Sequence, residues 1–221
     1  ALVDYRLIGG SGLDILREAA AIDWPAPLIM LTSLRDPLID VRAMQLGAFD
    51  FICKEDLRPD LLERSIRYNI EKKRLDAALA NPANAALLDR LAAMDLPQGY
   101  LAAGCLFQAL WNRTSGRAAD WGVKDYDVFY FDKSDLSWEA EDRVIRQVKS
   151  ATADLGVTVE VRNQARVHLW YAERFGDGYP QLRSARDGID RYLVACTCVG
   201  VEADGRALYA PDGLDDLAAG R

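Results

Sequence analysis

The fold of the second half of the chain is decided by residues 100–112, YLAAGCLFQALWN, and residues 125–131, DYDVFYF. A short apolar run meets Gly104 and then becomes amphipathic, which predicts a strand over residues 100–103, a turn, and a helix over residues 106–112. Alternating polar and large apolar side chains over residues 125–131 predict a second strand. Strands and helices are therefore expected to alternate in this half of the chain.

Further elements follow from the same patterns. An acidic helix is expected to begin after Ser137 and to end near Gly156, and a strand is expected over residues 157–161. Near the end of the chain, Pro211-Asp212-Gly213-Leu214 reads as a turn before a short helix, with Asp212 as its cap.

The first half of the chain repeats a cycle of strand and helix. Apolar runs predict strands at residues 1–3, 27–31 and 49–53, and amphipathic runs predict helices at residues 13–21, 37–46 and 60–79. Such alternation predicts a parallel sheet that is covered by helices on both faces. The first half is therefore expected to be an α/β unit.

A domain boundary is expected after the long helix over residues 60–79. This helix runs into Asn81-Pro82, and proline cannot continue a helix. The surrounding residues are small and polar, and a new helical pattern follows at residues 85–94. We therefore divide the chain into a first domain at residues 1–80, a linker at residues 81–86 and a second domain at residues 87–221.

The composition excludes several classes of function. With 27 Lys and Arg against 34 Asp and Glu, the net charge is −7, so the basic excess needed to neutralise a nucleic acid backbone is missing. No apolar run approaches the roughly 20 residues that cross a bilayer, and the chain does not open with a signal peptide. The four cysteines lie in apolar stretches, with a single histidine in the chain, which favours reduced core thiols over a zinc site. We expect a cytoplasmic protein.

Three polar residues end the three predicted strands of the first half: Asp4, Thr32 and Lys54. The carboxyl ends of parallel strands share one edge of the sheet, which is where ligands bind in open α/β sheets. There a carboxylate can accept a phosphoryl group, and a hydroxyl and a lysine can bind the phosphoryl oxygens. Separately, the same residues could be a cap, a loop hydroxyl and a surface lysine.

Together with their flanking residues, these positions resemble the receiver domain of bacterial response regulators. The matching stretches are ALVDYRL (1–7), GGSGLDIL (9–16), IMLTS (29–33), LGAFDFICK (46–54) and LLERSIRY (61–68). The resemblance implies a doubly wound, flavodoxin-like sheet with Asp4 as phosphoacceptor, Thr32 as switch hydroxyl, Lys54 as phosphate partner and Phe51 as the aromatic that reorients. It also implies a phosphorelay in which a sensor histidine kinase is the partner.

Two departures from the receiver pattern qualify this resemblance. Glu55 follows Lys54 where the family usually has proline. The match also begins at the third strand of the family, so the first two strands and the acidic pair that binds Mg²⁺ are absent. We therefore expect a truncated receiver that is phosphorylated poorly. The chain begins with alanine inside an apolar run, from which we infer that something upstream is missing.

Carboxylates in the second half form another constellation. Asp125 and Asp127 lie two residues apart on a predicted strand and so point to the same face, and Glu160 lies on the next strand. Paired carboxylates repel each other unless a cation lies between them, so the pair can hold Mg²⁺ or Mn²⁺ beside the turn at Gly104, where phosphates can approach. Taken alone, an Asp-x-Asp pair more often belongs to a turn or a strand edge.

This arrangement resembles the nucleotidyltransferase superfamily of the polymerase-β type. AAGCLFQALWN (102–112), KDYDVFYFD (124–132), VEVRNQARVHLWY (159–171) and YAPDGLDDL (209–217) are similar to a small nucleotidyltransferase-like family within it. The resemblance implies an α+β domain with a mixed sheet, Asp125 and Asp127 as metal ligands, Glu160 as third catalytic carboxylate, and Gly104 with Cys105 as the phosphate turn. Cys105 replaces the serine that is usual there, and a thiol is a weaker donor than a hydroxyl.

Two arginines follow Glu160. Arg162 or Arg166 could bind phosphate oxygens of a nucleotide, although a solvated or ion-paired arginine is an equal alternative. For His168 a structural role is favoured over that of a general base.

The function expected first is metal-dependent transfer of a nucleoside monophosphate from an NTP to an unknown acceptor. A signalling protein controlled by the receiver half and a nucleotide-binding pseudoenzyme remain alternatives. A joining of the two halves by an accident of gene fusion also remains open.

Overall fold

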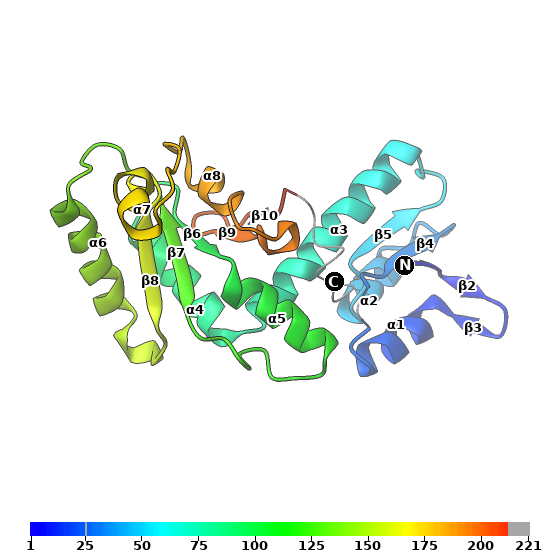
Figure 1. Cartoon of the computed structure of the whole chain (residues 1–221). Helices are drawn as coiled ribbons and strands as arrows, with labels where there is room; N and C mark the ends of the chain where they lie inside the picture. The colour runs from blue at the N-terminus through cyan, green and yellow to red at the C-terminus, as the bar shows by residue number, and fades with distance from the viewer. Residues whose placement is uncertain (25, 212–221) are drawn as a thin grey trace. The chain divides into compact units, whose positions relative to one another are not determined.

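The chain forms two compact units, each with its own hydrophobic core (Figure 1). The structure is a computed structural model that describes residues 1–24 and 26–211. The first unit comprises Ala1–Arg74, and the second comprises the described residues from Leu75 onward.

The first unit is built on a small parallel sheet. Its elements are β1 (Leu2–Asp4), β2 (Arg6–Leu7), β3 (Gly10–Ser11), α1 (Gly12–Ala21), β4 (Ile29–Thr32), α2 (Pro37–Gln45), β5 (Asp50–Cys53) and most of α3 (Pro59–Leu79). The strand order is β1-β4-β5, with both pairs parallel, and β2 and β3 form a separate antiparallel hairpin. The predicted parallel sheet is confirmed. The hairpin lies between the strand predicted at residues 1–3 and the helix predicted at residues 13–21, where no strand was expected.

Helix boundaries in the first unit follow from local chemistry. Asp36 caps α2, since its side chain accepts a hydrogen bond from the Leu38 amide, and Pro37 occupies the first helical turn. The core gathers apolar side chains from the sheet and from α1 and α2: Val3, Leu16, Leu28, Met30, Ala43 and Ala48. Helix α3 extends beyond this unit into the second.

The two units divide within α3, between residues 74 and 75. Ala77 and Ala78 are buried in the core of the second unit, which is why the division precedes the predicted linker at residues 81–86. Helix α4 (Pro82–Ala93) begins within these residues. The Asn81 side chain caps α4 by accepting from the Ala83 amide, and proline at the first position suits a helix start.

The second unit has a mixed five-stranded sheet. Besides α4 its elements are β6 (Tyr100–Ala102), α5 (Gly104–Thr114), β7 (Tyr126–Tyr130), α6 (Trp138–Ala151), η1 (Ala153–Leu155), β8 (Val159–Asn163), α7 (Val167–Phe175), α8 (Ala185–Ile189), η2 (Ala195–Thr197), β9 (Gly200–Glu202) and β10 (Leu208–Tyr209). The strand order is β10-β9-β6-β7-β8. Only β7 and β8 pair in parallel among these described strands, so the predicted mixed sheet is confirmed.

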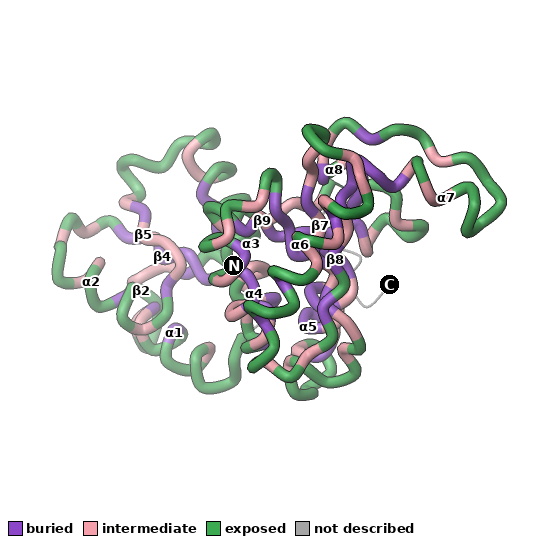
Figure 2. The backbone as a smooth tube through the Cα atoms, turned by 90° about the vertical axis from the view of Figure 1, so that its left-hand side faces the viewer, coloured by how far each residue is buried: buried purple, intermediate pink, exposed green. Residues whose placement is uncertain are grey.

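The two faces of this sheet are covered differently. One face packs against α4, α5 and α6 in the main core, which includes Leu88, Leu106, Val128 and Val148. The other face carries a smaller core beneath α8, with Tyr100, Ala102, Ala185, Ile189 and Cys198 (Figure 1). Figure 2 shows the inner strands buried, while the end of α7 and the chain that follows it are exposed. The less covered face is the one that carries the candidate site.

Several elements differ from the expectation. Asp125 lies just before β7 instead of within it, and β8 is shifted toward Asn163. Elements α7, α8, β9 and β10 carried no recognised signal. Asp212, expected to cap a terminal helix, lies outside the described residues.

Candidate active site

Two acidic side chains are neighbours on the less covered face of the sheet. In the pairing register Ala102 lies opposite Asp127, and Asp127 lies opposite Glu160. Directly paired residues project to the same face of a sheet, so Asp127 and Glu160 share this face. Tyr126 and Val128 alternate with Asp127 and enter the core on the opposite face.

The surroundings of Asp127 disfavour the negatively charged form of its carboxyl group. Burial, and then the negative charges of Asp125 and Glu160, raise the pKa of Asp127 to about 6. The positive charge of Arg162 and a hydrogen bond from Tyr192 act in the opposite direction. A nearby cation would stabilise the charged carboxylate, because it would offset both the burial and the repulsion.

The turn between β6 and α5 lies beside these carboxylates. Ala103 has φ 51° and ψ −118°, a left-handed conformation that costs an L residue of order 1–3 kcal/mol. A Cβ placed on Gly104 would lie 4.0 Å from Asp125 Oδ1, so the backbone approaches this carboxylate closely. Helix α5 begins at Gly104, and its first amides are suited to phosphate oxygens.

Cys105 contributes to the turn through its backbone. The side chain is buried, and its thiol donates to the Ala102 carbonyl at 3.6 Å. Burial, followed by the charge of Asp127, raises the thiol pKa well above its usual range. The thiol is therefore a neutral core group, and the substitution of serine by cysteine removes a hydroxyl without adding a reactive thiolate.

Tyr192 covers part of the face that carries Asp127. Its ring stacks on Phe129, with centroids 6.1 Å apart and an interplanar angle of 3°. Burial, and then the charge of Asp127, raises the pKa of Tyr192. The hydroxyl is therefore protonated, and it donates to the carboxylate.

The two predicted phosphate-binding arginines have different environments. Arg162 lies in the same row as Phe129, and its guanidinium contacts Glu160 Oε2 at 3.4 Å. Arg166 is buried, donates to the Leu136 carbonyl at 2.8 Å and forms a buried ion pair with Glu141. Arg162 is thus close to the carboxylates, whereas the environment of Arg166 favours the ion-paired alternative.

The donor set fits a divalent cation with two protein carboxylates. Within residues 1–24 and 26–211, no three His, Cys, Asp or Glu side chains are arranged to hold a metal together. The negative charge of Asp125 acts on Asp127, whereas Glu160 is exposed and contacts Arg162. Mg²⁺ commonly takes only one or two protein carboxylates and completes its shell with water and substrate phosphates. The aspartate pair meets that requirement.

A second polar group lies at the carboxyl edge of the first unit's sheet. Lys54 and Asp4 form an ion pair, and the hydrogen bond from Lys54 lowers the pKa of Asp4. Thr32 ends the neighbouring strand, is buried, and accepts from the Leu34 amide at 3.0 Å. Phe51 is half-buried against the core, and Glu55 pairs with Arg35 at 3.2 Å. The structure thus brings Asp4 and Lys54 together.

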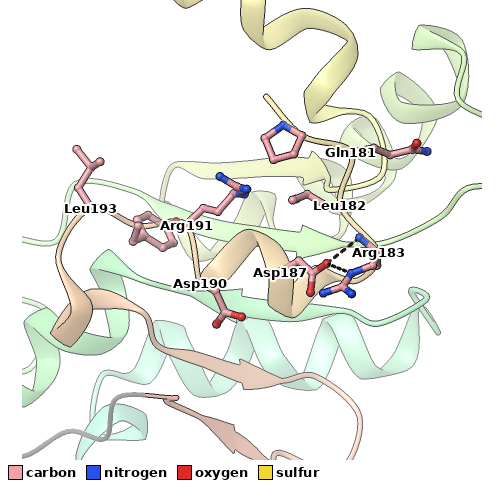
Figure 3. Close-up of a pocket in the computed structure, with 9 residues that line it drawn as sticks. Gln181, Leu182, Arg183, Asp187, Asp190, Arg191 and Leu193 are labelled. Atoms are coloured by element: carbon pink, nitrogen blue, oxygen red, sulfur yellow. Dashed lines mark hydrogen bonds and ion pairs between the residues drawn. The ribbon is translucent and has the colours of Figure 1, made fainter. Parts of the chain in front are cut away.

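A pocket of about 590 Å³ is formed by α8 and its flanking segments, on the less covered side of the second unit's sheet. We call it the 180–193 pocket after the residues that line it, which come from the segment before α8, from α8 and from the segment after it (Figure 3): Pro180, Gln181, Leu182, Arg183, Asp187, Asp190, Arg191, Tyr192 and Leu193. Tyr192 therefore contributes both to this pocket and to the surroundings of Asp127.

Sequence reasoning missed Tyr192, Arg191 and Glu141. Tyr192 is 65 residues from Asp127 along the chain, since 192 − 127 = 65, and no local pattern connects them. Glu141 lies in a helix rich in acidic residues, so the sequence does not distinguish this buried glutamate from its exposed neighbours. His168 lies in α7, where its Nδ1 atom is buried and has no partner within the described part of the chain.

The mixed sheet with its strand, glycine turn and helix defines the class of protein. An NMR structure described as revealing a CCA-adding enzyme head domain is 25% identical to this chain, with a TM-score of 0.53, and covers 66% of this chain and 74% of the other. The fold of the second unit is thus that of nucleotidyl-transfer enzymes.

Residues 89–221, more than half of the chain, match a nucleotidyltransferase family. The chain belongs to this nucleotidyltransferase family.

The N-terminal region resembles receiver domains of response regulators. The C4-dicarboxylate transport transcriptional regulatory protein DctD of Rhizobium meliloti is 40% identical over 72 residues, or 33% of this chain. Nodulation protein W of Bradyrhizobium diazoefficiens is 40% identical over 62 residues, or 28% of this chain. The matches span only 15% and 27% of those two proteins. Among the helices of residues 1–24 and 26–211, none is long and apolar enough to span a bilayer.

Proposed function

We propose that the second unit transfers a nucleoside monophosphate from an NTP to an acceptor hydroxyl or phosphate and releases pyrophosphate. The observation that carries this proposal is the placement of Asp127, which pairs with Glu160 across the sheet and lies two residues from Asp125 beside the Gly104 turn. The raised pKa of this half-buried carboxylate agrees with that placement, because enzymes keep such groups where a cation or a proton is handled. Membership of the nucleotidyltransferase family supports an NTP as the donor.

Each residue has a chemical role in this proposal. Asp125 and Asp127 would hold Mg²⁺ or Mn²⁺, and the amides at the start of α5 would bind phosphate oxygens. A bound divalent cation supplies charge neutralisation at the triphosphate. The acceptor oxygen forms a bond to the α-phosphorus while the bond from that phosphorus to the bridging oxygen of the β-phosphate breaks, and pyrophosphate carries away the electron pair. Glu160 takes the proton of an acceptor hydroxyl.

The test follows both products of an NTP that is labelled at its α-phosphate. The full chain is incubated with Mg²⁺ or Mn²⁺, each NTP in turn, and a protein-free small-molecule extract of bacterial cells that supplies acceptors. Label should appear in a new product with an equal amount of pyrophosphate. Asp127→Asn should lower this rate by roughly a hundredfold or more, since it removes a ligand of the cation that stabilises the negative charge of the transition state.

Asp177→Asn is the matched control. Asp177 is an exposed aspartate of the same unit, and it should be replaceable without effect. The proposal is contradicted if the wild-type chain neither transfers label nor binds NTP in a way that Asp127→Asn weakens. Tight, Asp127-dependent NTP binding without any product would instead identify a pseudoenzyme.

The first unit has a second candidate function, favoured by the contact between Lys54 and Asp4 at one edge of a parallel sheet. We propose that Asp4 accepts a phosphoryl group from a sensor histidine kinase or an acyl phosphate, with Thr32 and Lys54 binding its oxygens. Prolonged incubation with acetyl phosphate should then add an acid-labile mass of one phosphoryl group to a small fraction of the chain, which Asp4→Asn abolishes and Asp60→Asn does not. Absence of this mass in the wild-type chain counts against the switch.

A further inference from the structure

The charged side chains of the 180–193 pocket differ in how many hydrogen-bond partners they have within the chain. Asp187 accepts from the Arg183 amide at 2.9 Å, from the Arg183 guanidinium at 3.2 Å and from the Ser184 hydroxyl at 3.0 Å. Asp190 accepts from the Tyr209 hydroxyl at 2.8 Å. Both carboxylates of the pocket are therefore occupied by partners of this chain.

Arg191 is different. Across residues 1–24 and 26–211 it makes no ion pair, and in Figure 3 no dashed line joins it to another residue of the pocket. Its guanidinium lies over the Tyr179 ring, 5.0 Å from the centroid, and that ring packs on Tyr171 with centroids 4.4 Å apart. The aromatic ring restrains the guanidinium, and its donors remain available to an anion.

One residue, Tyr192, belongs both to the pocket and to the surroundings of Asp127. Tyr192 lines the pocket, stacks on Phe129 and donates to the Asp127 carboxylate. A ligand in the pocket would therefore contact the same tyrosine that contacts the central carboxylate. The pocket volume of about 590 Å³ is within the range of sites that hold small organic ligands.

We propose that the 180–193 pocket binds a phosphate-bearing substrate of the transferase, with Arg191 as its phosphate-binding residue. This inference rests on the proposed function, because it assigns the pocket to the same reaction. Arginine suits the role, since its planar fork can bind two phosphate oxygens at once. The phosphate is either the triphosphate of the nucleotide or a phosphate of the acceptor.

Calorimetry of the full chain in EDTA tests this assignment without metal. The probes are inorganic tripolyphosphate, ATP, adenosine, and glucose 6-phosphate as a phosphorylated acceptor analogue. The wild-type chain should bind at least one phosphate-bearing probe but not adenosine, and binding should weaken as salt is raised. Arg191→Gln should weaken that binding at least about tenfold, because a charge-assisted hydrogen bond is lost. Arg191→Lys should lose less, because it keeps the charge.

Arg174→Gln is the matched control, since Arg174 also lies over an aromatic ring, at 5.4 Å from the Phe175 centroid, and does not line the pocket. This variant should bind like the wild-type chain. Arg191-dependent binding of ATP and tripolyphosphate identifies the nucleotide as the occupant, whereas Arg191-dependent binding of glucose 6-phosphate alone identifies the acceptor. Unchanged phosphate binding by Arg191→Gln, or none by the wild-type chain, overturns the assignment.

The two proposals can fail separately. Asp127→Asn should retain metal-free phosphate binding and lose nucleotidyl transfer. If no transfer is found while Arg191-dependent phosphate binding persists, the transferase proposal fails and the anion site stands. If transfer depends on Asp127 while Arg191→Gln alters neither binding nor transfer, the pocket assignment fails alone.

Discussion

Asp127 is the residue on which the proposed chemistry depends. It is the middle member of the paired row formed by Ala102, Asp127 and Glu160. Burial and two neighbouring carboxylates raise its pKa, while the positive charge of Arg162 and the Tyr192 hydroxyl lower it. Because burial and the carboxylates outweigh the other two, the folded protein holds a proton on Asp127 more tightly than an unfolded chain does. The charged form of Asp127 therefore lowers the free energy of unfolding of the metal-free protein, and a bound cation would offset this loss.

The pH dependence of the free energy of unfolding should show the destabilisation caused by ionised Asp127. A carboxylate whose pKa is raised to about 6 favours the folded state below its unfolded pKa, near pH 4, and this contribution is lost as the pH rises through about 6. At pH 7.5 in EDTA, Asp127→Asn should therefore be more stable than the wild-type chain by about 2 kcal/mol. Near pH 4 the two should be equal. Urea unfolding at both pH values measures the difference.

Asp177→Asn provides the comparison for this measurement, because an exposed aspartate should change stability at neither pH. Equal stabilities of the wild-type chain and Asp127→Asn at pH 7.5 would mean that Asp127 is not under electrostatic strain.

The buried pair of Arg166 and Glu141 gives a contrasting residue-scale prediction. Glu141 also accepts from the Asn163 amide at 2.8 Å, so it fixes the end of β8. Arg166→Gln leaves a buried carboxylate unpaired and should lower the free energy of unfolding by about 3 kcal/mol in urea. Arg146→Gln, which breaks the exposed pair with Asp142, should cost less than about 1 kcal/mol. Comparable losses in the two variants would contradict a structural role for Arg166.

At the scale of elements, the sequence predicted those with long periodic patterns. The helices α1, α2 and α3 and the strands β4, β5 and β6 lie within a few residues of their predicted ranges, because amphipathic or apolar runs mark them. The carboxylates Asp127 and Glu160 were placed on neighbouring strands, and the structure pairs them directly. Both results rest on local pattern and strand order.

Elements with short patterns could not be predicted. Helix α8 has five residues and strand β10 has two, too few for a period to be seen. Strand β9 is as short as β6, but it is followed by β10 and not by an amphipathic helix of the kind that marked β6. These elements and the segments beside them form the cover over the less buried face, including Tyr192 and the 180–193 pocket. The contact between Tyr192 and Asp127 depends on tertiary packing, so the sequence alone gave no sign of it.

Gly200 on β9 lies beneath the buried side chain of Ile189 from α8. A Cβ there would lie 2.5 Å from Ile189 Cδ1 and 3.2 Å from Tyr100 Cδ1. Gly200→Ala should therefore lower the free energy of unfolding by about 1–3 kcal/mol, because the buried Ile189 side chain must shift. Gly178→Ala, whose Cβ would meet nothing within 4 Å, should be nearly neutral. Thermal or urea unfolding distinguishes the two, and a neutral Gly200→Ala would contradict this packing.

At the scale of the whole molecule, the division between the two units falls within helix α3. The last turns of α3 belong to the second unit, where Ala77 and Ala78 are buried and the Ala78 carbonyl accepts from the Asn84 side chain at 2.8 Å. The Asn81 side chain donates to the Tyr126 hydroxyl at 3.1 Å, which ties the same region to β7. The boundary between the two cores thus lies inside a continuous helix.

Truncation can test this boundary. A fragment that begins at Leu75 keeps Ala77, Ala78 and Asn81, and it should fold and retain Asp127-dependent NTP binding. A fragment that begins at Pro82 loses the buried methyl groups of Ala77 and Ala78, the Asn81 cap of α4 and the side-chain hydrogen bonds that Ala78 and Asn81 make with Asn84 and Tyr126. It should be less stable by at least about 3 kcal/mol in urea. Equal stability of the two fragments would place the boundary at residues 81–86, as the sequence indicated.

The most direct test of the account is to measure Mn²⁺ binding by electron paramagnetic resonance of the full chain, with a nonhydrolysable NTP analogue at pH 7.5. The free Mn²⁺ signal should fall by one ion per chain at saturation, and both Asp125→Asn and Asp127→Asn should weaken binding at least about tenfold, while Asp177→Asn should not. Binding of Mn²⁺ and nucleotide by Asp127→Asn as tightly as by the wild-type chain would contradict the assignment of this aspartate pair as the metal site.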